Sequence, residues 1–342
     1  MRQKTVIVLL IIFACIAVGV VLVLRYKGIS RKERSIGIHL FCDIPVQKIW
    51  EIDIKGADTQ VSLIKKDSIW RVKEHFSYLA DFSQISDLME KLKSVNTGES
   101  FKADRETLKR LMLMDPNDSR AKEDEKGRAL VLKDREGRIL KYIIFGKGMR
   151  QDQGKGFPLG QYVRFSGSTN VYLIDQYFTS LMQGPREWMR LEIVNVRPLD
   201  IKEIRAYKGT NKPVYVLIRE KGTNKFRVQK APLGKKIDDK LLRRIKDGIN
   251  YLSIEDVVDP KKDVSSFGID SGSYVEYELS NGMMYRVYPS KKCDKEACYM
   301  RISVSYSGSD KSLLKKAKKL NRMLSPWTYK ISKWRHESFF LP

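Results

Sequence analysis

The sequence predicts an α+β protein, in which an N-terminal transmembrane helix is followed by two tandem repeats of antiparallel β-hairpins packed with helices. Two observations lead to this prediction. Residues 5–24 (TVIVLLIIFACIAVGVVLVL) contain no charged side chain, and a helix needs about 20 apolar residues to cross a bilayer. A strand-like Ile-x-Glu-Ile pattern begins at Ile49 and again at Ile201, and the segments after each copy follow in the same order.

The apolar run predicts an uncleaved signal anchor, because it is longer than the apolar part of a signal peptide and no small-residue cleavage site follows it. Residues 1–4 then form a short tail, and residues 25–44 a basic juxtamembrane linker. The positive charges of that linker would keep the bulk of the chain in the cytoplasm, whereas a short tail before a long apolar segment favours export. We expect an exported, single-pass protein.

The first predicted repeat covers residues 45–190. A strand at 49–56 leads to a hairpin at 60–74 and to a helix at 83–95 with one apolar face. A second hairpin follows at 128–146, with Glu-Gly as turn residues, and then a strand at 161–165. A short helix near 176–182 closes the repeat.

The second predicted repeat covers residues 191–328 and has the same order. Its segments are a strand at 201–209, a hairpin at 214–230, a helix at 238–249, an Asn-Gly hairpin at 274–289, a strand at 299–306 and a closing helix at 311–324. Residues 329–342 form an aromatic and basic tail, which could dock on a partner or on the second repeat.

The charge balance points to anionic partners. The chain carries 65 Lys and Arg against 41 Asp and Glu, a formal charge of +24. Such an excess favours contact with phospholipid head groups, acidic polymers or nucleic acid, although a generally basic proteome would produce it as well. No nucleic-acid-binding motif is present, so we expect no nucleic-acid partner.

The closing helix of the second repeat (KSLLKKAKKLNRML) combines an apolar face with many lysines. We interpret it first as a structural helix with a solvated basic face, because its counterpart in the first repeat is an ordinary closing helix. The alternative is docking on an anionic surface, through Lys315, Lys316, Lys318, Lys319 and Arg322.

The sequence contains no recognisable catalytic, cofactor or metal site. Its three histidines, His39, His75 and His336, have no nucleophile or carboxylate at a suggestive spacing, and the glycine-rich residues 145–160 lack a phosphate-binding motif. Cys293 and Cys298 lack the further ligands of a zinc site. They form a local disulfide if the domain is exported, or two reduced thiols if it is cytoplasmic.

Several segments resemble DUF4340, a bacterial family of unknown function. They are VSLIKKDSIWRV, YIIFGKG, GQYVRFSGSTNVYLID, and residues 185–188 leading to LDIKEIRAYKG. The resemblance covers most of the chain beyond the apolar run, and it implies an N-terminal anchor with α+β units, often encoded beside an ABC-type transporter of the gliding-motility or auxiliary class. It carries over no functional residue.

These observations together predict a non-catalytic accessory protein of the cell envelope. It would sit in the bacterial inner membrane with its bulk in the periplasm, and transporter subunits would be its partners. The alternative is a binding module for an acidic envelope polymer or for anionic lipid head groups.

Overall fold

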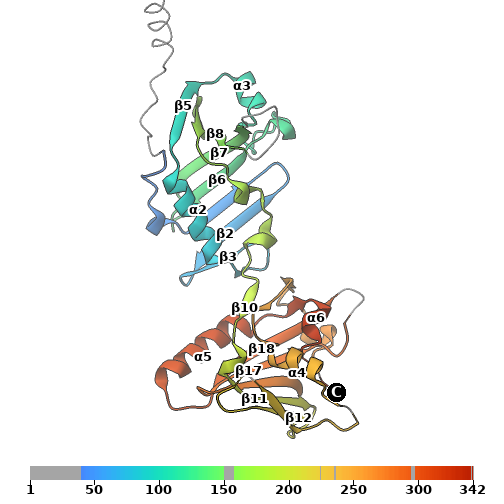
Figure 1. The fold of residues 1–342 in the computed structure, drawn as a ribbon. Helices are drawn as coiled ribbons and strands as arrows, with labels where there is room; N and C mark the ends of the chain where they lie inside the picture. The colour runs from blue at the N-terminus through green and yellow to red at the C-terminus, as the bar shows by residue number, and fades with distance from the viewer. Residues whose placement is uncertain are drawn as a thin grey trace, which may run out of the picture. The chain divides into compact units, whose positions relative to one another are not determined.

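The computed structural model describes residues 40–149, 158–223, 225–234, 236–293, 297–339 and 341. Antiparallel strands dominate these residues (Figure 1). The strands form a nine-stranded sheet with the order β4-β3-β2-β1-β6-β7-β8-β9-β5, an eight-stranded sheet with the order β13-β12-β11-β16-β17-β18-β19-β15, and a small β10-β14 pair. The α+β prediction is therefore wrong, because the described chain is mostly β-sheet.

The helices are short and lie between strands of the sheets. The first part of the chain contains η1 (Val46–Lys48), β1 (Glu51–Lys55), β2 (Gln60–Lys66), β3 (Ile69–Val72), β4 (Tyr78–Leu79), α2 (Phe82–Ser94), β5 (Thr97–Lys102), α3 (Arg105–Arg110), η2 (Glu123–Glu125), β6 (Arg128–Lys133), β7 (Ile139–Met149), β8 (Gly160–Phe165), β9 (Asn170–Ile174), η3 (Thr179–Met182) and η4 (Pro185–Trp188).

The remaining elements follow β9 and its two short helical turns. They are β10 (Glu192–Val194), η5 (Pro198–Asp200), β11 (Ile201–Lys208), β12 (Tyr215–Arg219), β13 (Phe226–Lys230), α4 (Asp239–Lys246), β14 (Leu252–Ser253), β15 (Asp256–Val257), η6 (Val264–Phe267), β16 (Ser273–Leu279), β17 (Met283–Pro289), β18 (Cys298–Tyr306), α5 (Lys311–Leu324), β19 (Tyr329–Ile331) and α6 (Lys333–His336).

The membrane prediction also needs correction. No helix in the described part of the chain is long and apolar enough to cross a bilayer. The expected span, residues 5–24, lies outside the described residues, as do the tail and most of the linker. The single-pass inner-membrane location with a periplasmic bulk depended on that helix and is withdrawn. The end of the expected linker is part of the fold, because Phe41 is fully buried and packs edge-on against Phe165.

Internal packing divides the chain into two units. The first consists of Met1–Gln60 with Ser86–Met182, and the second of Val61–Ile85 with Gln183–Pro342. The expected repeats, residues 45–190 and 191–328, divide the chain at a different place, because the β2-β3 hairpin groups with the second unit.

The first unit covers one sheet face with its own chain. A cap segment, defined as residues 103–126, places Leu108, Leu113 and Met114 in one apolar cluster with side chains of the sheet. Arg164 of β8 fixes this cap, because its Nε donates to the Leu113 carbonyl oxygen at 2.7 Å. Burial lowers the pKa of Arg164, and backbone carbonyls supply the partners that its buried guanidinium requires.

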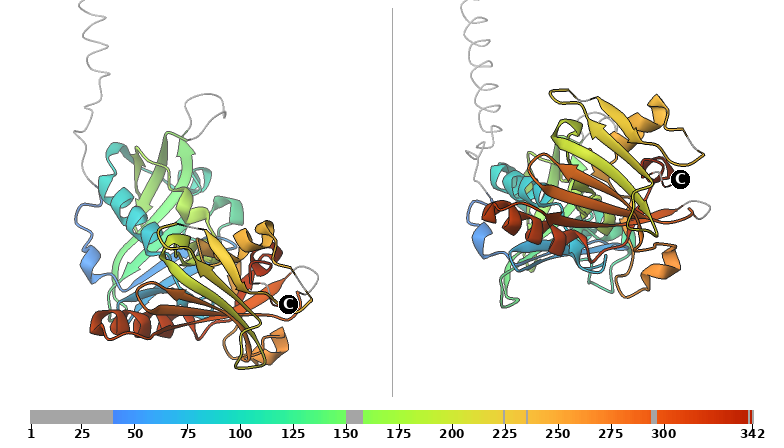
Figure 2. Two further views of the ribbon diagram at one scale, coloured as in Figure 1. Left: turned by 60° about the horizontal axis from the view of Figure 1, so that its bottom comes forward. Right: turned by 90° about the horizontal axis from the view of Figure 1, so that it is seen from below.

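In the second unit, helix α5 covers residues 301–306 of β18, which β19 leaves unpaired. The helix lies beside β18 (Figure 2), and Asn321 accepts a hydrogen bond from the backbone N–H of Val304 at 2.9 Å. A strand edge with free N–H groups invites pairing with other chains, and a covering helix prevents it. The expected C-terminal tail belongs to this unit, because its Tyr329 and Ile331 are fully buried in β19.

Both large sheets carry charged side chains at the same place in their ladders. Glu51 of β1 lies opposite Lys133 of β6, and Glu203 of β11 lies opposite Glu278 of β16. Lys133 Nζ contacts Asp53 at 2.6 Å and Glu51 at 2.7 Å. Burial opposes the charge of Lys133, but the two carboxylates outweigh it and raise its pKa.

Replacing Lys133 with Met should destabilise the protein by about 3 kcal/mol, because the buried Asp53 then loses its counter-ion. Urea unfolding measures the change. A double variant that also carries Asp53→Asn should recover part of the loss, and equal stability of Lys133→Met and wild type would contradict the assignment.

The N-cap of α5 gives a second test. Asp310 accepts hydrogen bonds from the backbone N–H groups of Ser312 and Leu313, so Asp310→Ala should cost about 1 kcal/mol and Asp310→Asn much less. Thermal unfolding of the two variants distinguishes this capping role from a role of the charge alone.

Candidate functional site

Helix α5 presents one packed face and one basic face. Ala317 and Leu324 are buried, and Leu320 is half-buried. Because side chains three, four, seven and eight positions apart share a helix face, the cations gather on the opposite side. This basic face of α5 is formed by Lys311, Lys315, Lys318, Lys319 and Arg322, all of them exposed.

The basic face borders a groove within the second unit. The groove has a volume of about 560 Å³. Lys315, Lys319 and Arg322 line it from α5, and Arg71 of β3 lines it from the other side. The two other residues of the predicted anionic-surface contact, Lys316 and Lys318, are exposed on α5 and do not line the groove.

The floor of the groove is apolar and firmly packed. It includes Ile69, Met323 and Trp327. The ring of Tyr78 packs edge-on against Trp327 at 5.0 Å, and its hydroxyl donates to the carbonyl oxygen of Arg190 at 3.2 Å. Burial raises the pKa of Tyr78, so the phenol stays a protonated donor. These contacts hold the β3 side of the groove against the rest of the unit.

Positive charge dominates the groove. Its lining contains four cationic side chains and a single carboxylate, Asp67. Within the described chain, no carboxylate forms an ion pair with Arg71, Lys315, Lys319 or Arg322, and the buried Nε of Arg71 has no hydrogen-bond partner. Cations that line an apolar floor favour an anionic ligand, because fixed charges act strongly where water is partly excluded.

The described histidines form no nucleophile-base pair. His75 Nδ1 lies 3.4 Å from the carboxylate of Asp256. His336 Nε2 lies 2.8 Å from the carbonyl oxygen of Ser290 and 3.4 Å from its hydroxyl. The carbonyl can only accept, so Nε2 is the donor there and cannot take the hydroxyl proton. His39 lies outside the described residues.

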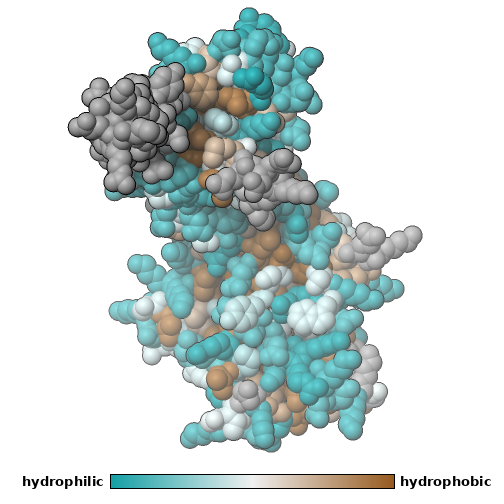
Figure 3. Space-filling view, turned by 45° about the horizontal axis from the view of Figure 1, so that its top comes forward, coloured by the Kyte–Doolittle hydropathy of each residue, from teal (hydrophilic) through white to brown (hydrophobic). Residues whose placement is uncertain are grey.

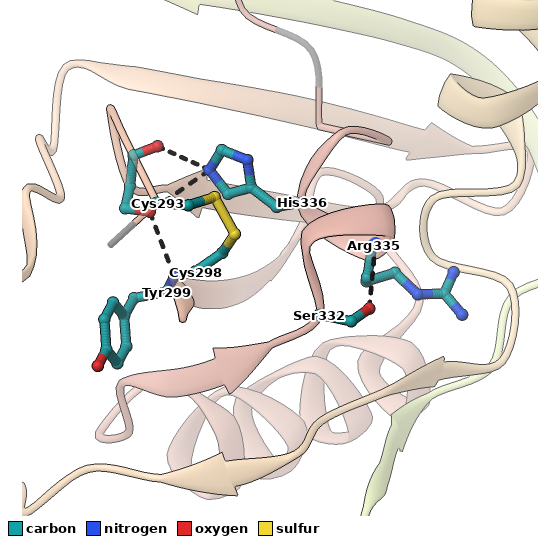
Figure 4. Close-up of a disulfide and its surroundings, with 7 residues drawn as sticks. Cys293, Cys298, Tyr299, Ser332, Arg335 and His336 are labelled. Carbon is teal, nitrogen blue, oxygen red and sulfur yellow. Dashed lines mark hydrogen bonds between the residues drawn. A yellow bond between two sulfur atoms is a disulfide. The ribbon is translucent and has the colours of Figure 1, made fainter. Parts of the chain in front are cut away.

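Cys293 and Cys298 form a disulfide beside His336 (Figure 4). Their Cα atoms are 4.3 Å apart, and the potential ligand atoms of the three residues lie within 4.8 Å of one another. A metal would need thiolates at this place. The disulfide supplies none, and in this form the cluster links the start of β18 to its neighbouring loop.

The outer surface is mostly hydrophilic. On the face drawn in Figure 3, hydrophilic side chains cover most of the described surface and hydrophobic ones form small patches between them. The groove is distinguished by the combination of cations with an apolar floor, since isolated exposed lysines are common on protein surfaces.

Sequence reasoning found the α5 half of the groove and missed the β3 half. Arg71 lies in the Trp70-Arg71-Val72 segment of the hairpin predicted at 60–74. Trp70 is buried, whereas Arg71 on the opposite face of the strand is only half-buried. The period-two alternation of strands carried this signal. No sequence pattern indicated that Trp327 lines the groove.

Comparison with known proteins gives one family match. The model of a domain of unknown function, DUF4340, matches residues 70–272. No curated protein and no solved structure matches the chain.

The disulfide offers a test of this region. Reduction of Cys293–Cys298 should lower the unfolding free energy by about 2 kcal/mol, because a short closed loop restricts the unfolded chain. Urea unfolding with and without a phosphine reductant measures the difference. A Cys42→Ser background removes the one free cysteine of the described chain, and identical curves would contradict the prediction.

Proposed function

We propose, from the premise that this chain belongs to the DUF4340 family, that it is a non-catalytic module that binds an acidic polymer in the groove between α5 and β3. The observation that carries this proposal is the set of four cationic side chains around one apolar floor, with a single carboxylate among them. A chain of net charge +24 attracts such a ligand from a distance, and the groove gives it a defined place to bind.

The packing of α5 favours a polymer over a lipid surface. An amphipathic helix binds a bilayer by inserting its apolar face. In α5 this face is occupied, because Ala317 and Leu324 are buried and Asn321 is bonded to the edge of β18. The exposed side carries the cations and a single exposed apolar side chain, Leu314, and the cations suit repeated carboxylate or phosphate groups.

The alternation of cations along α5 suits a repeating ligand. Lys311, Lys315, Lys319 and Arg322 are one helical turn apart. A linear polymer can therefore contact several cations at once, and each further contact raises the effective concentration of the next one. The transporter-accessory role remains a separate prediction that no described side chain supports or opposes.

Binding should depend strongly on the groove cations and on salt. We expect the full chain to bind long-chain polyphosphate or poly-L-glutamate at low ionic strength. The triple variant Lys315→Glu, Lys319→Glu, Arg322→Glu should lose about tenfold or more in affinity, and added salt should weaken the wild type because exposed charges are screened. Fluorescence anisotropy of labelled polymer measures both effects.

A matched control separates the groove from net charge. The variant Lys93→Glu, Lys261→Glu, Lys262→Glu changes the net charge equally at exposed lysines outside the groove. An equal loss in this control, or no binding of either polymer at low salt, would overturn the proposal. Stronger binding to anionic vesicles than to both polymers would move the assignment to lipid.

A further inference from the structure

Equivalent faces of the two large sheets carry different kinds of side chain. The ladders of the two sheets align at Glu51 and Glu203, which lie opposite Lys133 and Glu278. The strand pairing on either side of these two glutamates matches buried apolar residues of the first unit with residues of the second. Ala129, Val131 and Ile144 correspond to Tyr274, Glu276 and Tyr288.

Among the described residues of the second unit, no segment corresponds to the cap segment. The shorter connection between β15 and β16 contains η6, whose Phe267 packs on Tyr299 at 4.8 Å and covers one end of the face. The ladders also match Arg164 with Arg301. Arg164 holds the cap at Leu113, whereas Arg301 donates to the carbonyl oxygen of Ser325.

The uncovered surface is rich in tyrosine and arginine. We define the tyrosine face as Tyr207, Tyr274, Glu276, Arg286, Tyr288 and Arg301. The Tyr207 and Tyr274 rings stack with centroids 4.7 Å apart, and Arg286 lies over the Tyr274 ring at 5.2 Å. All three tyrosines are partly exposed. Tyrosine and arginine are enriched in protein interfaces, where a flat aromatic side chain supplies area at low entropic cost.

The charges beside these rings balance. Arg205 pairs with Glu203 and Glu276 at 2.8 and 2.9 Å and also with Glu278. Arg286 pairs with Glu276 at 2.7 Å, and Lys202 with Glu278 at 2.9 Å. Three cations thus meet three carboxylates. This local neutrality matters because two copies of a chain with a net charge of +24 repel each other over most of their surface.

We infer that the tyrosine face is an isologous interface through which two copies of this chain associate. A two-fold interface brings a surface against itself, so it requires self-complementary charge. The ion-paired groups on and beside the face, three cations and three carboxylates, meet this requirement. Arg301 is a further cation, and its guanidinium donates to the carbonyl oxygen of Ser325. An acidic partner would be attracted to the basic face of α5 instead, so the second copy is the occupant that the charges favour.

Sedimentation velocity of the full chain tests this inference. A mild nonionic detergent keeps the apolar residues 5–24 dispersed. We expect a monomer-dimer equilibrium between about 1 and 100 µM, and Tyr274→Ala should weaken the association about tenfold or more. Trp334→Ala is the matched control, because Trp334 is an exposed aromatic of the same unit outside the tyrosine face.

A second variant guards against a folding defect. Tyr207→Glu acts on the same face through a partly exposed side chain, and it leaves both arginine partners of the buried Glu276 in place. It should also weaken the dimer, and added salt should partly restore it, because the new repulsion is electrostatic. A monomer at every concentration, or an association unchanged by both variants, would overturn the inference.

Discussion

A sheet has two faces and two edges, and the way in which this chain covers them determines the rest of its structure. In the first unit the cap segment covers one face, and the buried guanidinium of Arg164 fixes it to the sheet through the Leu113 carbonyl oxygen. In the second unit α5 covers the edge of β18 through Asn321. Both solutions satisfy backbone polar groups that would otherwise be buried without partners or exposed to other chains.

This use of α5 explains why its charges are available for binding. Because one side of the helix packs and bonds to β18, its exposed side carries mainly polar and charged residues, with Leu314 as the exposed apolar one. The β2-β3 hairpin adds Arg71 and the apolar floor beside them. The proposed binding site is therefore a consequence of edge protection, and it requires no catalytic or metal chemistry.

A comparison of the sheet faces of the two units explains the tyrosine face. Where the first unit has small and apolar side chains under its cap, the second has tyrosines and compensated charges without a cap. A buried charge is tolerated when it is paired, and Glu276 has two arginine partners. The face is thus stable when uncovered and is still suited to contact with a second copy.

The sequence by itself determined the strands and their turns, because alternating side chains and Asn-Gly or Glu-Gly turns are local signals. It also determined the cationic character of residues 311–324 and the positions of the two paired cysteines. The fold class predicted from the sequence was wrong. Short helices and strands give local patterns of similar strength, and these patterns do not show how many strands assemble into each sheet. Only the tertiary structure decided that Arg71 and Trp327 meet Lys319 in one groove. It also decided that Tyr207, Tyr274 and Tyr288 share an uncovered face. The position of His336 beside the disulfide likewise depends on the tertiary structure. Arg71 is far from Lys319 in the chain, Tyr207 from Tyr274, and Cys298 from His336, so contacts between them leave no local pattern in the sequence.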